Sequence, residues 1–460
     1  MKKIFKEISV HFIGIGGIGM SGIAEVLLSQ GLKVTGSDAS ESANILKLRD
    51  LGARISIGHQ PEHIIDATIV VYSSAIKKDN PEMVYALAHQ KPLMKRAEML
   101  AELMKLKHGI AIAGTHGKTT TTSFLATILQ EGMLDPTYII GGIVENLKGH
   151  ARVGEGQYLV AEADESDGSF LLLSPIFSVI TNIDNDHLDY YGSEEALQTA
   201  FIEFANRVPF YGVVALNSND QTLMSLQSKI KRPTITFGIG EQESNIDYRA
   251  SKIQIAEHGT SYELWIMGKL IGRVEIHLPG NHNILNSLGA LSIAHHMGLE
   301  INQIITSMKC FKGVGRRFQT LYRSENCTII DDYGHHPTEI RETIKTAKQM
   351  IGQRELIVVF EPHRFSRTRD CWDQFLHCFN GADKLYLAPI YPASEAPLEG
   401  ISTDVLVEDI NRLHPAFCES MNSINKLPEM LKDFTKRNCL VVCMGAGTIG
   451  KVLKDGVKEL

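Results

Sequence analysis

A glycine turn between an apolar segment and a run of threonines constrains this chain more than any other feature. Residues 110–113 are apolar, and Gly114, Gly117, Lys118 and Thr119 follow in the order Gly-Thr-His-Gly-Lys-Thr. Glycines let the backbone approach a phosphate closely, a helix N-terminus presents N–H groups to it, and a lysine neutralises its outer oxygens. The stretch therefore predicts a strand, a phosphate-binding loop and a helix that together hold a nucleoside triphosphate.

The match is to a shorter form of the P-loop pattern. The general form G-x-x-x-x-G-K-[ST] has a glycine where this chain has Ile112. A strand-to-helix turn that contains Gly-Lys-Thr by chance is the alternative, but four consecutive threonines suit ligand binding or capping better than a helix interior. Thr119 places a hydroxyl where a magnesium ion between the β- and γ-phosphates needs an oxygen ligand, so we expect Mg²⁺ to take part.

Composition limits the class of protein. The chain has 460 residues, enough for about three domains. Its 46 basic and 53 acidic residues give a formal charge of −7, so we expect no general nucleic-acid or membrane surface. The seven cysteines all lie from Cys310 onward, their number is odd and no C-x-x-C occurs, which indicates neither a disulfide framework nor a zinc site.

The first residues of the chain give no targeting signal. Residues 1–7 include three lysines and a glutamate, and the apolar segment that follows them is interrupted by glycines rather than continuous. We therefore expect no signal peptide or membrane anchor, and a cytoplasmic protein.

A second glycine motif lies near the N-terminus. Residues 8–13 read as a buried strand, residues 14–19 satisfy G-x-G-x-x-G, residues 20–30 read as a helix, and the next strand ends in Asp38. This is a Rossmann-type fingerprint, which alone would suggest a dinucleotide. However, glycines at a helix N-terminus accept any diphosphate and the acid accepts any ribose-like diol, so a UDP-sugar fits equally well.

Further alternation of strands and helices completes a first domain. It comprises a strand at residues 69–72, the small loop 73–75, a helix after Asn80, a short strand near Leu93 and a helix over residues 97–107. We place the first domain at residues 1–107.

Acidic residues gather after two predicted strands of the second domain. The strand at residues 158–161 leads into Glu162–Asp167, and the strand at residues 179–183 leads into Asp184–Asp189, which contains His187. Because the carboxyl ends of parallel strands line the ligand crevice, both clusters can face phosphates bound at the P-loop, where carboxylate oxygens suit magnesium. Solvated acidic loops are the alternative for any one of these carboxylates.

The rest of the second domain is less specific. A helix is predicted over residues 194–207, and the alternating segments between Lys252 and Ile276 suggest antiparallel strands. Asn283 and Asn286 share one face of the helix that follows, although N-capping by one of them is the simpler explanation. We place this domain at residues 108–311.

The third domain, residues 312–460, collects cationic groups at strand ends. Arg316 and Arg317 follow a flexible glycine link, a strand at 329–330 leads into residues 331–337, and a strand at 356–360 leads into residues 361–369. Such groups bind carboxylates or phosphates. A last G-x-G-x-x-G occupies residues 445–450, but no second strand follows to supply a ribose-binding acid, so we predict only a tight turn into the final helix.

These sites together suggest a reaction. A triphosphate site with metal ligands, a separate diphosphate domain and a basic third domain suit ATP-dependent activation of a carboxylate, followed by attack of an amine to form an amide. Three domains around one crevice can also exclude water and protect an acyl phosphate.

The motifs resemble those of the Mur ligase family over nearly the whole chain. They are GIGGIGMSGIAEVL at 14–27, GTHGKTTTT at 114–122, EADESD at 162–167, NIDNDHL at 182–188, GRRF at 315–318, DDYGHHP at 331–337 and EPHRFSRT at 361–368. The resemblance implies an α/β protein of three domains: an N-terminal Rossmann-like UDP-sugar domain, a central P-loop ATPase-like domain and a C-terminal Rossmann-like domain. It also implies ATP- and Mg²⁺-dependent addition of L-alanine to the lactyl carboxylate of UDP-N-acetylmuramate in peptidoglycan synthesis.

The resemblance further implies roles for individual residues. The implied ATP-binding residues are Gly114, Thr115, His116, Gly117, Lys118, Thr119, Thr120, Asn283, Asn286, Arg317 and Asp332. The implied metal ligands are Thr119, Glu162 and His187, and the implied catalytic residues are Lys118, Glu162, His187 and Arg317. Those for the UDP-sugar are Gly16, Gly17, Gly19, Asp38, Ser73 and Ser74, and those for the sugar acid and amino acid are Tyr333, His335, His336, His363, Arg364 and Arg367.

Other functions remain open at this stage. Relatives that add later residues use a carbamoylated lysine after the metal histidine, but this chain has no lysine between Lys148 and Lys229. A recycling ligase that attaches a whole tripeptide to the same sugar is the nearest rival, and residues 17–22 favour the alanine-adding reaction. A dehydrogenase would explain only residues 8–38, and a non-catalytic nucleotide-binding or scaffold protein would leave the metal site unexplained. Monomer and dimer both remain possible.

Overall fold

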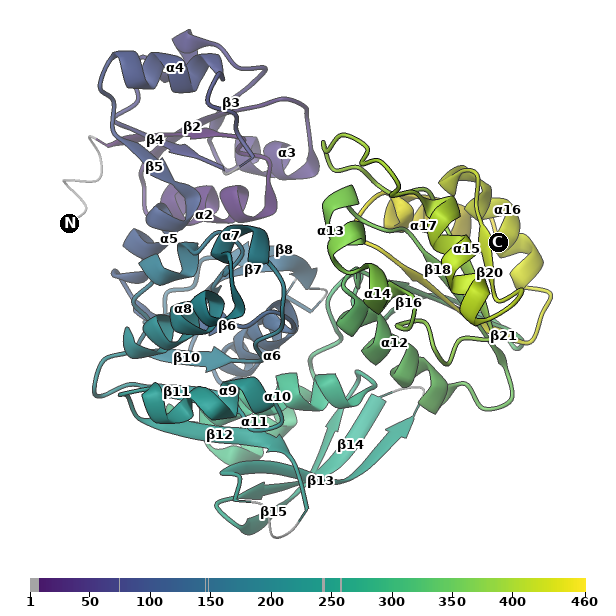
Figure 1. Ribbon diagram of the computed structural model, residues 1–460. Coiled ribbons are helices and arrows are strands. Elements are labelled where there is room, and N and C mark those ends of the chain that lie inside the picture. The colour runs from purple at the N-terminus through teal and green to yellow at the C-terminus, as the bar shows by residue number, and fades with distance from the viewer. Residues whose placement is uncertain (1–7, 74, 145, 148, 242–244, 257–258) are drawn as a thin grey trace. The chain divides into compact units, whose positions relative to one another are not determined.

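Three β-sheets organise the computed structural model (Figure 1). The structure describes residues 8–73, 75–144, 146–147, 149–241, 245–256 and 259–460. The helices and strands follow one another along the chain in the α/β alternation that the sequence predicts.

The first sheet is parallel, with strand order β3-β2-β1-β4-β5. β2 and β4 flank β1 on opposite sides, so the glycine loop after β1 begins where the strand order reverses, which is where doubly wound sheets bind ligands. Helix α4 covers one face, and α2, α3 and α5 cover the other (Figure 1). The elements are β1 (Ser9–Ile13), α2 (Ile18–Ser29), β2 (Lys33–Asp38), α3 (Ala43–Asp50), β3 (Arg54–Ile57), the 3₁₀ helix η1 (Pro61–Ile64), β4 (Ile69–Tyr72), α4 (Pro81–Ala88), β5 (Leu93–Lys95) and α5 (Arg96–Met104).

Two predicted helix boundaries in this part were wrong by two or more residues. Helix α2 begins at Ile18 rather than at residue 20, because Gly17 already occupies its N-cap. Helix α5 ends at Met104 rather than at residue 107. The chain turns there, and the Lys107 ammonium donates hydrogen bonds to the carbonyl oxygens of Gly154 and Gly156, both at 2.6 Å.

The second sheet has the order β15-β14-β13-β12-β11-β10-β6-β9-β7-β8. Its strands from β13 to β7 are parallel and β8 is antiparallel to β7. The strands are β6 (His108–Ala113), β7 (Thr137–Val144), β8 (Gly149–Arg152), β9 (Tyr158–Glu162), β10 (Phe177–Ile180), β11 (Val213–Asn217), β12 (Thr234–Ile239), β13 (Tyr248–Ala256), β14 (Gly259–Ile266) and β15 (Lys269–Ile276). The helices are α6 (Lys118–Glu131), η2 (Ser169–Leu172), α7 (Leu188–Tyr191), α8 (Glu194–Asn206), α9 (Gln221–Leu226), η3 (Gln227–Lys229), α10 (Asn281–His296) and α11 (Ile301–Met308).

The edge of this sheet contains an antiparallel pair. β14 and β15 are hydrogen-bonded neighbours, and only Met267 and Gly268 connect them. A two-residue connection can join only antiparallel strands, as the alternating sequence predicts.

The third sheet has the order β16-β17-β21-β18-β19-β20, parallel except for β16. Alternate residues of its central strands pack into two separate apolar clusters, one against α12, α14 and α15 and the other against α16 and α17. The strands are β16 (Gln319–Arg323), β17 (Cys327–Asp332), β18 (Glu355–Phe360), β19 (Lys384–Leu387), β20 (Cys418–Ser420) and β21 (Cys439–Met444). The helices are α12 (Pro337–Met350), α13 (Phe365–Asp370), α14 (Trp372–Phe375), α15 (Thr403–Leu413), η4 (Ile424–Lys426), α16 (Leu427–Phe434) and α17 (Ile449–Val457).

The chain divides into two compact units. The first comprises Met1–Lys252, Tyr262–Val274 and Leu285–Lys312, and the second comprises Ile253–Ser261, Glu275–Ile284 and Gly313–Leu460. In the first unit, one apolar cluster is shared by the first and second sheets, and it includes Phe12, Leu100 and Phe204.

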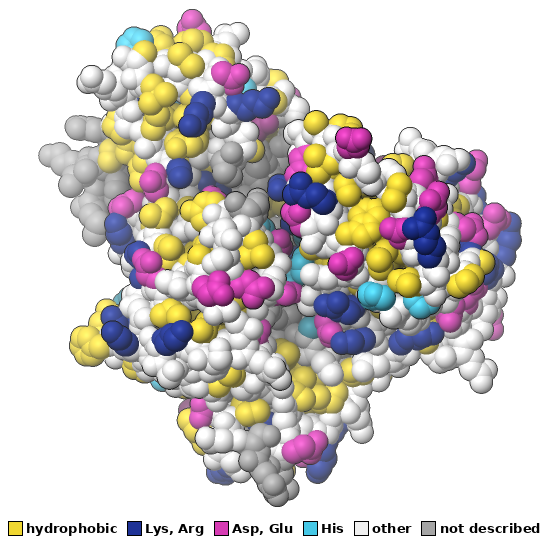
Figure 2. Space-filling model, in the orientation of Figure 1, with side chains coloured by type: hydrophobic (Ala, Val, Ile, Leu, Met, Phe, Trp, Pro, Cys, Tyr) yellow, Lys and Arg dark blue, Asp and Glu magenta, His cyan; other side chains and the backbone are white. Residues whose placement is uncertain are grey.

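Charged side chains of both signs lie on the surface of the molecule (Figure 2). Basic and acidic side chains are interspersed on the face drawn in Figure 2. Across the described parts of the chain, no helix combines the length and the apolar character that crossing a membrane requires.

Candidate active site

The glycine turn after β6 has a backbone that only glycine can adopt without strain. Gly114 has a φ of +132° and Gly117 a φ of +84°, and α6 begins directly afterwards at Lys118. A Cβ on Gly114 would lie 2.0 Å from the Thr181 hydroxyl oxygen, and a Cβ on Gly117 would lie 2.4 Å from Asn286 Oδ1. The loop is therefore packed closely against its neighbours, and a side chain at either glycine would be strained as well as crowded.

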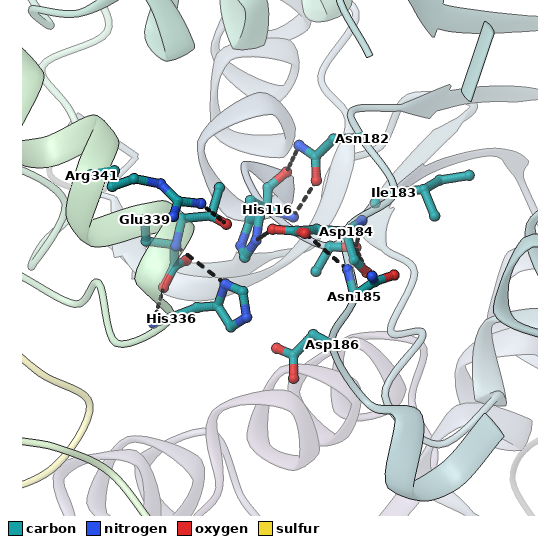
Figure 3. Close-up of polar contacts among 12 residues, drawn as sticks. His116, Asn182, Ile183, Asp184, Asn185, Asp186, His336, Glu339 and Arg341 are labelled. Carbon is teal, nitrogen blue, oxygen red and sulfur yellow. Dashed lines mark hydrogen bonds and ion pairs between the residues drawn. The ribbon is translucent and has the colours of Figure 1, made fainter. Parts of the chain in front are cut away.

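The segment after β10 holds this loop in place. The Thr181 hydroxyl donates to the His116 carbonyl oxygen at 2.5 Å. The Asn182 side chain accepts from His116 N at 2.8 Å and donates to the His116 carbonyl at 2.9 Å. His116 Nε2 lies 3.0 Å from Asp184 Oδ2, and Asp184 N donates to the Thr115 hydroxyl at 2.9 Å. Figure 3 shows His116 between Asn182 and Asp184.

These bracing residues were absent from the predicted site. Asn182 and Asp184 belong to the motif at residues 182–188, but only His187 of this motif was predicted to be a site residue. The signal that could have identified them is their position. The strand order β10-β6-β9 places the end of β10 directly beside the end of β6.

Lys118 lies in a polar environment at the first residue of α6. Its ammonium donates to the Gly114 carbonyl at 2.6 Å and the Thr115 carbonyl at 3.1 Å, and it lies 2.7 Å from the carboxylate of Glu165. Burial lowers the pKa of Lys118, but Glu165, together with Asp164 and Glu162, more than offsets this and raises the pKa above its ordinary value. The Lys118 ammonium is therefore positively charged, as binding of a phosphate would require.

Glu165 is a third residue, after Asn182 and Asp184, that was absent from the predicted site. Its side chain is almost completely buried, at 2% exposure, and its partner Lys118 makes that burial tolerable. His187 Nε2 lies 3.7 Å from Glu165 Oε1 and 3.6 Å from Asp186 Oδ2. Glu165 thus links the predicted metal histidine to the lysine that is predicted to bind phosphate.

Thr119 and Glu162, two of the predicted metal ligands, lie together. The Thr119 hydroxyl donates to Glu162 Oε2 at 3.1 Å, and Gly141 N donates to Glu162 Oε1 at 2.6 Å. A hydroxyl and a carboxylate at the base of a phosphate loop are the oxygen donors that Mg²⁺ prefers. The donor chemistry therefore fits this ion.

The other predicted nucleotide residues of this region differ in their surroundings. Thr120 is buried in the first turn of α6. Asn286 Oδ1 accepts from the Thr121 hydroxyl at 3.2 Å and so faces α6. Asn283 Nδ2 donates to the Pro279 carbonyl at 2.7 Å, a contact with its own helix start.

The glycine loop after β1 is fixed by Asp38. Gly16 N donates to Asp38 Oδ2 at 2.8 Å, and a Cβ on Gly16 would lie 3.0 Å from that same oxygen. Gly17 is the N-cap of α2, and Gly19 lies against the guanidinium of Arg96. Asp38, which was predicted to contact a ribose-like diol, therefore also orients the glycine loop.

The remaining predicted residues of this loop cluster follow β4. The Ser73 hydroxyl accepts from Ala75 N at 3.3 Å. Ser74 lies outside the described residues.

In the second unit, Arg317 and Asp332 meet the start of α12. The Arg317 guanidinium lies 3.4 Å from the carboxylate of Glu339 and 5.2 Å from the centre of the Tyr333 ring. Asp332 accepts from Phe318 N and Gly334 N, both at 2.7 Å, and burial raises its pKa to about 6. Asp332 thus shapes the backbone around Arg317.

Aromatic and cationic side chains of this unit form a cluster. The rings of Tyr333 and His335 lie 5.5 Å apart, and those of His335 and His363 lie 5.9 Å apart. Arg367 lies 3.5 Å from His363 Nδ1. Burial and the neighbouring His335, Arg367 and Arg364 lower the pKa of His363 to about 4, so its ring is neutral at pH 7.

Two members of the predicted pocket have structural roles of their own. His336 is 1% exposed and caps α12. Arg364 has a φ of +73° at the N-cap of α13, and its N donates to the Tyr391 carbonyl at 2.8 Å.

A carboxylate from another part of the chain, that of Glu361, binds the last glycine motif. Glu361 accepts from the Thr448 hydroxyl at 2.7 Å and from Ile449 N at 2.9 Å, at the start of α17. A Cβ on Gly447 would lie 2.6 Å from Glu361 Oε2. The turn runs from β21 into the final helix, as predicted, and a carboxylate of the chain occupies the position that a phosphate would need.

Protein-family models match the chain in the regions that form all three sheets. The Mur ligase family catalytic domain model matches residues 9–108, the Mur ligase middle domain model matches residues 112–294, and the Mur ligase glutamate ligase domain model matches residues 316–447. The chain belongs to the Mur ligase family.

The relatives of this Mur ligase match it over nearly their whole length. It is 46% identical over 441 residues to the UDP-N-acetylmuramate–L-alanine ligase of Geobacter sulfurreducens, covering 96% of this chain and 95% of that protein. The solved structure of a UDP-N-acetylmuramate–alanine ligase from Thermotoga maritima is 28% identical with a TM-score of 0.82. The match covers 98% of this chain and 99% of that chain. A murein peptide ligase from Psychrobacter arcticus, 23% identical with a TM-score of 0.72 and the same coverage, shares the fold. The predicted three-domain α/β fold of this Mur ligase is thus confirmed.

Proposed function

We propose that this chain joins L-alanine to the carboxylate of UDP-N-acetylmuramate at the expense of ATP, in the synthesis of a peptidoglycan precursor. The observation that carries the proposal is the 46% identity, over 96% of the chain, to a curated ligase of that name. The braced phosphate loop with Lys118 at its helix start supports the use of ATP.

The proposed reaction has two steps. A carboxylate oxygen of the sugar attacks the γ-phosphorus of ATP, the bond to ADP breaks, and an acyl phosphate forms. The alanine nitrogen then attacks the acyl carbon, inorganic phosphate leaves, and the nitrogen loses a proton as the amide forms. We assign Lys118 to the transferring phosphoryl group, since its ammonium lies at the loop that would hold the outer phosphates.

We propose that ATP is used with Mg²⁺, held by Thr119, Glu162 and His187. The adjacent oxygen donors of Thr119 and Glu162 support this assignment. When bound, the ion neutralises negative charge on the phosphates. Lys118 contributes a second positive charge from the protein, and Glu165 keeps that lysine in place.

We propose the remaining assignments by resemblance to the family. Residues 1–107 bind the UDP-sugar, residues 108–311 bind ATP, and residues 312–460 bind the amino acid and complete the ATP site. ATP is also contacted by Thr115, His116, Thr120, Asn283, Asn286, Arg317 and Asp332, and Arg317 assists catalysis. The UDP-sugar is contacted by Gly16, Gly17, Gly19, Asp38, Ser73 and Ser74, and the sugar acid and alanine by Tyr333, His335, His336, His363, Arg364 and Arg367. We place the reaction in the cytoplasm, where ATP is available.

Transfer of an intact tripeptide to the same sugar is the alternative reaction. The murein peptide ligase supports it only through the shared fold, whereas curated relatives at 42–46% identity carry the name of the alanine-adding enzyme. Mass spectrometry of the product decides between them. With UDP-N-acetylmuramate, L-alanine, ATP and Mg²⁺, we expect a product heavier by one alanine residue. A product formed only with tripeptide would overturn the proposal.

A further inference from the structure

A carboxylate that the proposed reaction does not use lies buried beneath the UDP-sugar loop. Glu82 is the second residue of α4, and its side chain is completely buried. Its Oε2 accepts from the Ser37 hydroxyl at 2.5 Å, and its Oε1 lies 2.8 Å from His63 Nδ1 and 3.3 Å from Gln60 N. A buried carboxylate is costly unless such partners satisfy it. Glu82 is therefore held at both of its oxygens.

Histidines surround the same carboxylate. His11 Nε2 and His59 Nδ1 lie 3.6 Å and 3.5 Å from Glu82 Oε2, and His63 contacts the other oxygen. Burial raises the pKa of Glu82, but the nearby His11 ring and the hydrogen bonds from Ser37 and His63 outweigh it and lower the pKa to about 2. Glu82 is thus an anion throughout the physiological range.

Ser37 connects this anion to the glycine loop. Its only hydroxyl proton goes to Glu82, so its oxygen accepts from His59 Nδ1 at 2.9 Å. Its backbone carbonyl accepts from Gly14 N at 2.8 Å and from Ile15 N at 3.1 Å. The end of β2, which accepts these hydrogen bonds from the loop, is therefore anchored on Glu82.

The neighbouring residue strengthens this connection. Asp38 follows Ser37 directly and accepts from Gly16 N. The backbone of Ser37 and the side chain of Asp38 together hold three successive residues of the loop, and the Ser37 side chain ties both to the core of the domain.

We propose that Glu82 is a positioning residue for the UDP-sugar, which acts through Ser37 to keep the glycine loop in its binding conformation. The inference rests on the proposed function, because that function assigns the loop to the UDP-sugar. Glu82 itself lies below the strand end and does not touch the ligand in this account.

Steady-state kinetics of Glu82→Gln test the role. The substitution keeps the shape of the side chain and removes its charge, which weakens the hydrogen bonds to Ser37 and His63. We expect the KM for UDP-N-acetylmuramate to rise about tenfold, with kcat and the KM for ATP within about twofold of wild type. Glu62→Gln is the matched control, because Glu62 is an exposed carboxylate on η1 of the same domain, and it should leave all three constants unchanged.

A double variant tests the route through Ser37. Ser37→Ala should reproduce the rise in KM, and the double variant with Glu82→Gln should do no more than the larger single change, because both interrupt one connection. Ser37→Ala alone still tests the route if Glu82→Gln does not fold. An unchanged KM in a folded variant, equal increases in the KM values for ATP and the sugar, or additive effects would overturn the role of Glu82. A wild type without turnover of this sugar would instead overturn the proposed function.

Discussion

Replacing Lys118 by methionine should lower both the melting temperature and kcat, and a second substitution at Glu165 should restore only the melting temperature. Methionine keeps the length and most of the volume of the lysine stem but removes the ammonium. Glu165, with a side chain only 2% exposed, then loses the cation that lies 2.7 Å away. The substitution therefore leaves a buried carboxylate without its charged partner, while it also removes the predicted phosphate ligand.

The size of the stability effect follows from this geometry. Removing one partner of a buried ion pair costs about 3–5 kcal/mol. For a unit of this size, that corresponds to a fall in melting temperature on the order of 10 °C. Loss of a charge that stabilises a transferring phosphoryl group should in addition lower kcat by a factor of about 100 or more.

The double variant Lys118→Met/Glu165→Gln is the decisive control. It removes both charges, so thermal unfolding should return close to that of wild type, while phosphate release from ATP stays at the level of the single variant. UDP-sugar binding should be largely intact in both variants, because we propose that this site lies at the first sheet. A single variant as stable as wild type would refute the ion-pair argument, and a double variant with wild-type turnover would refute the role of Lys118.

Two further perturbations probe other parts of the molecule. Glu162→Ala removes the carboxylate that accepts from the Thr119 hydroxyl, so half-maximal phosphate release should need roughly tenfold more Mg²⁺, and an unchanged Mg²⁺ titration would count against this ligand. Compared with His363→Gln, the wild type should lose free energy of unfolding as the pH falls from about 6.5 to about 4, because the pKa of His363 is lowered to about 4 and the unfolded chain binds the extra proton in that window. Urea unfolding at pH 7 and pH 5 measures the difference, and a difference that does not vary with pH would contradict it.

Local patterns were sufficient to predict the two loops that carry most of the proposed chemistry. Gly114 and Gly117 stand between an apolar strand and a helix, and their positive φ angles are a property of the turn itself. The rule that parallel strands end at one edge of a sheet also predicted that the acidic clusters after β9 and β10 flank the loop after β6.

Pairings between distant residues could not be predicted in this way. Glu165 meets Lys118, and Glu82 meets Ser37, only because particular strands are neighbours and particular helices cover them. Hydrophobic periodicity reports which face of an element is buried and not which other element covers it. The helix that stops at Met104 rather than at residue 107 has the same cause, since Lys107 bonds to a distant loop.

In the proposed reaction, this chain activates a sugar carboxylate with ATP and transfers it to alanine. The most direct test is phosphate release from ATP and Mg²⁺ with UDP-N-acetylmuramate, with kcat/KM measured for L-alanine and for the intact stem tripeptide. We expect phosphate release that requires the sugar and a kcat/KM for L-alanine at least about a hundredfold above that for the tripeptide. A preference for the tripeptide, or phosphate release that does not depend on the sugar, would contradict the proposed reaction.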